Sequence, residues 1–297
     1  MYRSFCCALF LLSAAYSYGQ SDDSASTGPE VDVTYQQTGR SGFHSNQTTL
    51  SEDQINLDIS IPLVGNENQG VETDFILQRD YYTIKRFQSS VGLLSSPIAR
   101  ANVSSWQISG ITPLNSQWSL LSVGEIGTYA ASDAALSRSF AEQVSFGSVY
   151  TFAGTKAKLG LGLELENRVG GARRILPFPL IDWKITDQIS LLSFDGSSGK
   201  LSYHVNRAVT LFGQLEFESY DLRLSKHSSL RSGIIREESF PVTAGIRWQI
   251  NRHLSLSSSI GVAWGQTYRF ETDGGSTVFD GHTHHPMIAA FELDFSV

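Results

Sequence analysis

The sequence has little of what several common protein classes need. It contains two cysteines in 297 residues, Cys6 and Cys7, so from residue 8 onward it offers neither a disulfide nor a cysteine-based metal site. Charged residues make up 17% of the chain, against about 25% in average soluble domains, and Ser, Gly, Thr, Gln and Asn fill the difference. This composition argues against a helical enzyme domain and is typical of strands and turns.

Positive charge and long apolar runs are also scarce. The formal net charge is -7 and the pI is about 5.5, so we expect no nucleic-acid partner. No run reaches the ~18 apolar residues that a transmembrane helix needs. The apolar content of 41% nevertheless suffices for a sizeable core, which excludes wholesale disorder.

The N-terminal segment has the pattern of an export signal. A basic start ending at Arg3 precedes an apolar run over residues 5–15, and Ser17 and Gly19 place small residues at a cleavage site before Gln20. We therefore expect a signal peptide over residues 1–19, a flexible lead-in over 20–30 and one domain over 31–297. Both cysteines fall inside the signal peptide.

From Val31 onward the dominant period of apolar residues is two, as in β-strands. In residues 157–166 an alanine and four leucines occupy the odd positions, opposite Lys, Gly and Glu; similar alternation marks 55–63, 209–218 and 254–264. Nine to eleven alternating residues are the length that crosses a bilayer as a tilted strand. Expected strands are 31–39, 54–63, 72–82, 100–112, 117–128, 142–152, 157–167, 175–185, 188–194, 199–205, 209–220, 240–250, 253–264 and 286–297.

The connections alternate between short and long. Short turns are expected at 113–117, 153–155, 186–188, 206–208 and 251–253, and mostly longer loops at 39–53, 83–99, 130–141, 221–239 and 265–285. Outer-membrane barrels arrange periplasmic turns and external loops in this way. We therefore predict an all-β, antiparallel transmembrane β-barrel of about fourteen strands, or twelve if 188–194 or 199–205 fails. Pro177 and Pro179 each remove a ladder donor, so we expect a bulge or a late strand start there.

Aromatic residues and the C-terminus agree with a barrel. Trp118, Trp183 and Trp248 lie near short turns, where an interfacial girdle belongs, and Tyr81, Tyr82, Tyr129 and Tyr220 lie near the opposite strand ends. Residues 291–297 alternate up to Val297 and are similar to the closing strand that the barrel-assembly machinery reads, although that pattern usually ends in Phe. A soluble β-sandwich is the alternative, but it would seldom keep such regular alternation of connection lengths.

A longer stretch supports the same class. Residues 177–188, with two prolines, Trp183 and a tight turn, followed by residues 203–207, resemble an uncharacterised family of bacterial outer-membrane β-barrel proteins. The resemblance covers about a sixth of the chain. It implies the fold and an outer-membrane location, and it carries no catalytic residues.

Searches for catalytic, nucleotide and metal motifs return little. No GxGxxG after a strand, GxxxxGK[ST] or HExxH is present. Three histidines over 281–285, beside Asp280, could bind zinc or copper, but nothing in the sequence orients them. Loop residues such as His44, His227 and His285 have Ser and Asp nearby without a nucleophile elbow. We therefore expect no enzyme, no cofactor and no metal site.

The polar face of the strands is more informative. Residues expected to face the lumen are Asp58, Lys158, Glu164, Glu166, Glu216, Glu218, Arg247, Glu292 and Asp294. Their excess of carboxylates favours a passive channel or transporter for small polar solutes with an acidic lumen. The alternative is a structural or adhesive surface barrel that acts through its external loops. If the lumen is occluded, we expect folded-in loops to occlude it. Five basic residues are expected outside the lumen, near lipid head groups: Arg173, Arg174, Arg223, Lys226 and Arg231.

Overall fold

The computed structural model describes residues 28–43, 48–66, 69–89, 92–93, 96–155, 157–193 and 197–297. The expected signal peptide, both cysteines and most of the lead-in lie outside these residues. Among the described residues no helix is long and apolar enough to cross a membrane.

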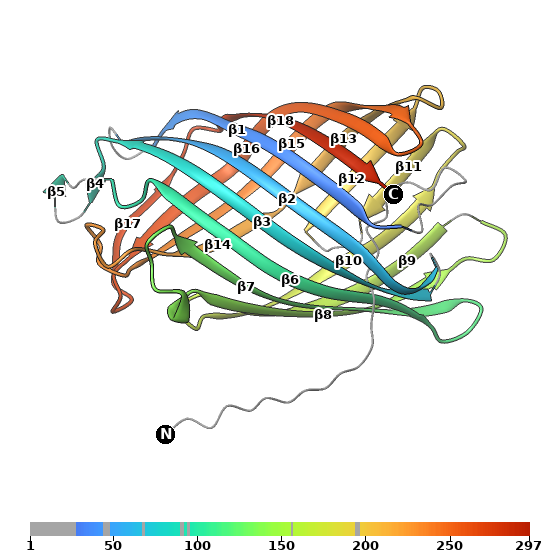
Figure 1. The fold of residues 1–297 in the computed structure, drawn as a ribbon, viewed down its shortest axis with the longest axis horizontal. Helices are drawn as coiled ribbons and strands as arrows, with labels where there is room; N and C mark the ends of the chain where they lie inside the picture. The colour runs from blue at the N-terminus through green and yellow to red at the C-terminus, as the bar shows by residue number, and fades with distance from the viewer. Residues whose placement is uncertain are drawn as a thin grey trace, which may run out of the picture.

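The described strands close into an antiparallel barrel of fourteen strands (Figure 1), which confirms the predicted fold. Each strand pairs with its neighbour along the chain, and the last pairs with the first, Val31 lying opposite Phe295. The barrel strands are β1 (Glu30–Gly42), β2 (Thr49–Asn66), β3 (Gln69–Lys85), β6 (Arg100–Pro113), β7 (Trp118–Ala131), β8 (Phe140–Thr151), β9 (Ala157–Asn167), β10 (Arg173–Lys184), β11 (Ile189–Ser193), β12 (Ser198–His204), β13 (Val209–Glu216), β15 (Ile234–Asn251), β16 (Leu254–Glu271) and β18 (Met287–Ser296).

The remaining elements belong to the long-connection end of the barrel, which we take as external. After Phe217, β14 (Glu218–Arg223) continues from β13 and pairs with residues 234–239 of β15. Strand β17 (Thr277–His282) pairs with residues 267–271 of β16. The β3–β6 connection carries the two-residue strands β4 (Gln88–Ser89) and β5 (Gly92–Leu93). A short 3-10 helix, η1 (Leu136–Arg138), lies between β7 and β8.

The outer surface is the apolar face of the alternating strands. Leu161 is 73% exposed and Ile260 56%, and the three tryptophans near short turns, Trp118, Trp183 and Trp248, are all exposed. A contiguous apolar belt on a closed barrel is stable only in lipid. The protein is therefore a β-barrel of the bacterial outer membrane.

Several strands extend beyond their predicted bounds. In one of these extensions the apolar side chains change from the outer to the inner face of the strand, so alternation did not predict it. The segments 221–239 and 265–285, expected as loops, contain the end of β14, the start of β15, the end of β16 and all of β17. In β16, Trp264 points outward, and Gly265 at φ +62 lies at a shift in the β15–β16 register. Because one extra residue exchanges the two faces of a strand, Tyr268 and Phe270 point into the barrel instead of continuing the outward row.

Of the four tyrosines that the sequence places near the external strand ends, three do not face lipid. Tyr81 is exposed on the outer surface, but Tyr82 is buried inside, and Tyr129 and Tyr220 line internal cavities. These tyrosines occupy the inward positions of their strands. Their neighbouring carboxylates, such as Glu125, which accepts a hydrogen bond from the Tyr129 hydroxyl at 2.8 Å, make the interior the more polar side.

We expect Leu161→Arg to destabilise the barrel by about 2–4 kcal/mol, because it places a charge on the lipid face near mid-bilayer. The matched control is Gln143→Arg on the neighbouring strand β8, whose side chain lines the lumen, and we expect a much smaller effect there. Urea unfolding in lipid vesicles measures both. Equal destabilisation would contradict the assignment of the two faces. Gly162 is unsuitable as the control, because an added Cβ would lie 2.3 Å from the Phe178 ring.

Candidate functional site

The barrel encloses a polar lumen that forms the candidate site. Its main cavity has a volume of about 630 Å³. Side-chain amides, hydroxyls and carboxylates from strands around the whole circumference line it, including Gln36, Gln54, Asn56, Asp58, Gln78, Gln107, Gln143, Gln214, Glu216 and Glu292. The few apolar members, among them Phe178 and Phe212, come from β10 and β13.

A second cavity of about 360 Å³ adjoins the first under β14. The two share lining residues, including Phe178, Glu216, Glu218 and Tyr220. The second cavity is more mixed in character, because Val103, Leu176 and Phe217 line it together with carboxylates and Arg168 and Arg174.

The nine residues expected to face the lumen all lie on the inner side of the wall, in two groups. Asp58, Glu164, Glu166, Glu216, Glu218 and Glu292 line the cavities directly. Lys158 pairs with Asp182 at 3.2 Å, and Arg247 pairs with Asp294 at 3.2 Å and more loosely with Glu292 at 3.8 Å. Part of the inward negative charge is thus neutralised near the short-turn end.

Basic residues that the sequence pattern did not predict for the lumen neutralise another part. Lys200 lines the main cavity, with its ammonium 4.6 Å from the centre of the Phe212 ring. Arg174, expected outside, lies inside and pairs with Glu166 at 2.7 Å. Arg168 is 7% exposed and pairs with Asp221 at 2.6 Å, and Arg236 also contacts Asp221.

Arg223 also departs from its expected place among the lipid head groups. It is 6% exposed, and its guanidinium donates to the carbonyl oxygens of Arg138 and Ser232 and pairs with Asp273 at 3.1 Å. Arg223 therefore ties β14 to η1 and to the β16–β17 connection. Alternation did not reveal this role, because it depends on contacts between loops distant in sequence.

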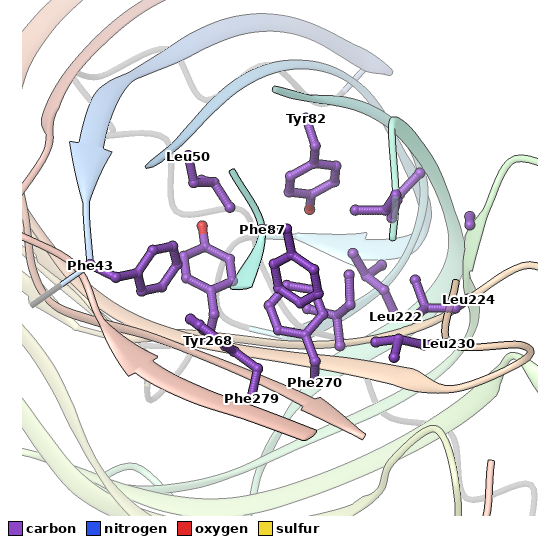
Figure 2. Close-up of a cluster of buried hydrophobic side chains, with 14 of the residues drawn as sticks. Phe43, Leu50, Tyr82, Phe87, Leu222, Leu224, Leu230, Tyr268, Phe270 and Phe279 are labelled. Carbon is purple, nitrogen blue, oxygen red and sulfur yellow. The ribbon is translucent and has the colours of Figure 1, made fainter. Parts of the chain in front are cut away.

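An apolar cluster fills the external end of the lumen (Figure 2). Phe279 lies near its centre, with ring centroids 4.9 Å from Phe43, 5.4 Å from Phe87 and 5.5 Å from Phe270. We call this set of residues the external plug; its other buried members are Leu50, Tyr82, Ile98, Ala101, Val103, Ala131, Leu222, Leu224, Leu230, Ile235 and Tyr268. They come from strand extensions as well as from loops, so the expectation of folded-in loops was only partly right.

A layer of buried polar groups lies directly beneath the plug. The Tyr268 hydroxyl donates to Glu237 Oε1, and Gln266 Nε2 donates to the same oxygen at 2.8 Å. Gln266 in turn accepts from Thr283 at 3.0 Å. These bonds join β15 and β16 to the segment after β17 and fix the floor of the plug.

The histidine segment over 281–285 shows no arrangement for a metal in the described part of the chain. There, no group of three or more His, Cys, Asp or Glu side chains is placed to hold an ion. The backbone N–H of His284 donates to the carbonyl of Gly42 at 3.0 Å, and the His285 ring packs against Trp264. These contacts give the segment a structural role at the end of β1.

Comparison with solved structures finds barrels of low sequence identity. An outer membrane channel, COG4313, from Pseudomonas putida F1 is 10% identical with a TM-score of 0.46, over 95% of this chain and 100% of that one. The Pseudomonas putida toluene transporter TodX is 9% identical with a TM-score of 0.40, over 92% and 90%. The KdgM porin in complex with disordered oligogalacturonate is 9% identical with a TM-score of 0.36, over 90% and 99%.

Sequence comparisons define the family without adding a function. No curated protein matches the chain. A family model described as a domain of unknown function (DUF6268) matches residues 30–296, the full extent of the barrel strands. The protein belongs to this family.

Proposed function

We propose that the protein is a passive outer-membrane channel for small polar solutes, with an acidic lumen. The observation that carries the proposal is the main cavity of about 630 Å³, whose lining offers hydrogen-bonding groups on every side. Side chains fill the interior of barrels of about eight strands, whereas wider barrels can enclose an aqueous channel, and this barrel has fourteen strands.

Two buried atoms on the cavity wall support an aqueous content. In the described part of the chain, Asn56 Oδ1 and Asp58 Oδ1 are buried without a protein hydrogen-bond partner, and both residues line the main cavity. Buried polar atoms are normally satisfied by protein or by ordered water. Water or a polar solute in the lumen would supply the missing donors.

The external plug makes this structure a closed state in our proposal. Passage to the outside then requires the plug to loosen or move. Its members come from the external parts of β2, β3, β6, β7, β14, β15, β16 and β17 and from the connections after β1, β3 and β14. Peripheral connections of this kind are the least stable parts of a fold.

Two partners follow from the barrel itself. Lipid surrounds the apolar belt. We further propose that the barrel-assembly machinery recognises β18, in which Phe291, Leu293 and Phe295 point outward and Glu292 and Asp294 inward.

The open channel is expected to prefer K⁺ over Cl⁻. Carboxylates on the cavity walls outnumber the basic residues Arg168, Arg174 and Lys200, and fixed negative charge concentrates cations within a Debye length of ~8–10 Å. The reversal potential across a salt gradient in planar bilayers measures this preference, which should fade as salt rises. The double substitution Glu164→Gln, Glu216→Gln should reduce it, whereas Asp187→Asn with Asp280→Asn, which removes the same charge outside the lumen, should not. Anion preference would refute the acidic-lumen proposal.

The second candidate is a surface barrel that acts through its external end. It is favoured by the extension of β15 and β16 to 18 residues each, well beyond the 9–11 that a bilayer needs, which builds a rigid platform above the membrane. Absence of conductance from correctly folded protein, including variants with a disrupted plug, would favour this candidate.

A further inference from the structure

Within the described part of the chain, one segment of the barrel wall lacks continuous backbone pairing. Strand β10 pairs with β9 over residues 173–183, but β11 pairs only with residues 181–184 of β10. Among the residues that the structure describes, residues 173–180 therefore have a partner strand on one side only and form an edge. Pro177 and Pro179 lie within this edge, in unbroken register with β9, so the expected bulge is absent. Prolines are tolerated where a strand has no second partner.

The facing edge belongs to β14. The β12–β13 ladder ends at Ser198 opposite Glu216, and β14 then pairs with β15 alone until Arg223 meets Ala130 of β7. Strand β14 thus passes over the ends of β8 to β12 and joins the wall again on the other side. Between it and β10 the described residues form no ladder.

Side chains close this gap in place of a ladder. Arg174 donates to the Ser219 hydroxyl at 3.1 Å and stacks over the Phe217 ring at 5.4 Å from its centre. Phe217 also packs against Phe240, with centroids 5.0 Å apart. Phe240 is 47% exposed on the outer surface, whereas Phe217 lines the second cavity. The Phe217 ring therefore connects the lumen with the lipid-facing side.

The gap lies at the level of the outer leaflet. On β10 the edge runs from the outward-facing Ile175, 65% exposed, toward Trp183 at the short-turn girdle. On β15, Phe240 is the last outward apolar residue before Glu238, which is exposed and pairs loosely with Arg168 at 3.7 Å. An open sheet edge is not tolerated in hydrocarbon unless it lines a cavity or is buried in protein. We therefore expect this edge to border a cavity that opens toward the lipid.

The second cavity behind the gap suits a molecule with two kinds of surface. Leu176, Phe178 and Phe217 line its wall at the gap. The cavity is also lined by carboxylates that outnumber its two arginines, Arg168 and Arg174; these carboxylates are Glu125, Glu142, Glu164, Glu166, Glu216, Glu218 and Asp221. An apolar chain would contact the first group, and a positively charged head group the second.

We propose that the gap between β10 and the β13–β14 junction is a side passage, through which amphipathic molecules with a cationic head group move between the outer leaflet and the lumen. This inference goes beyond the proposed aqueous channel. It gives the lumen a route past the external plug, and Phe217 with Arg174 forms its closure.

Cysteine labelling tests the passage directly, because the chain from residue 8 onward contains no native cysteine. We expect Phe217→Cys, in phosphatidylcholine vesicles, to react with both a membrane-impermeant maleimide and a lipid-soluble maleimide. Phe240→Cys should react only with the lipid-soluble reagent, and Gln143→Cys only with the impermeant one. Leu176→Cys, on the opposite edge, provides a second variant, and heat-modifiable migration on gels verifies folding.

Protection by a ligand tests the chemistry. Decyltrimethylammonium should abolish labelling of Phe217→Cys, decanoate should not, and Glu216→Gln in the same chain should restore labelling. Reaction of both gap variants with the lipid-soluble reagent alone, or equal protection by the two amphiphiles, would overturn the proposal. If Gln143→Cys fails to react even when Phe279→Ala opens the external plug in the same chain, the aqueous channel is refuted, and protection of the gap variants by the cation alone still supports the side passage.

Discussion

Deletion of residues 295–297 is expected to abolish assembly of the barrel. Phe295 lies opposite Val31 on one side and Leu254 on the other, so the last residues of β18 close the circle between β1 and β16. The Ser296 N–H donates to the carbonyl of His253, and the Val297 N–H donates to that of Pro29. Without them the ends of β1 and β16 at Val31 and Leu254 lose their partner. Each backbone group that is left unpaired in the membrane costs several kcal/mol.

The measurement is the amount of heat-modifiable protein in the outer-membrane fraction, which should fall to background as the chain is degraded in the periplasm. A matched control, Phe295→Leu with Val297→Leu, retains the backbone pairing and the apolar outward face and should assemble normally. Normal assembly of the truncated chain would refute the assignment of β18 as the closing strand.

The sequence alone was sufficient for the strand count, because each membrane-spanning strand alternates. Every second side chain of a strand points to the same face. The lipid-facing side of β9 could therefore be predicted from its alternating leucines, which are Leu159, Leu161, Leu163 and Leu165. The weakest segments, β11 and β12, form as well, although they are short. The lumen positions of residues such as Glu216 and Asp58 follow from the same parity.

The alternation of apolar and polar residues could not predict which way side chains point in the strand extensions beyond the membrane. There the outward face meets water and the inward face is apolar, so Tyr268 and Phe270 look like lipid-facing residues until the register shift at Gly265 is known. The positive φ of this glycine is compatible with a bulge, but a glycine in a strand has other uses. Likewise, the prolines of β10 indicated a defect in pairing, but not that the missing partner would be β11.

Phe279→Ala is expected to open the external end of the channel. The Phe279 ring contacts Phe43, Phe87 and Phe270, so its removal leaves a void at the centre of the plug. Such a truncation of a buried phenylalanine costs about 3–5 kcal/mol, which is comparable to the free energy that holds peripheral segments of a fold closed. Single-channel recordings should therefore show frequent openings in this variant and rare ones in the unmodified protein.

Leu180→Ala is the control, because Leu180 is 0% exposed, much as Phe279 is at 6%, but packs in a separate apolar cluster and is not among the residues that line the two cavities. It should lower the unfolding temperature by a similar amount without increasing the frequency of openings, since the plug stays intact. If both variants conduct equally, general loosening of the barrel explains the current and the plug is not the gate. If neither conducts while both remain folded, the apolar cluster seals the barrel permanently, and the external surface becomes the site of function.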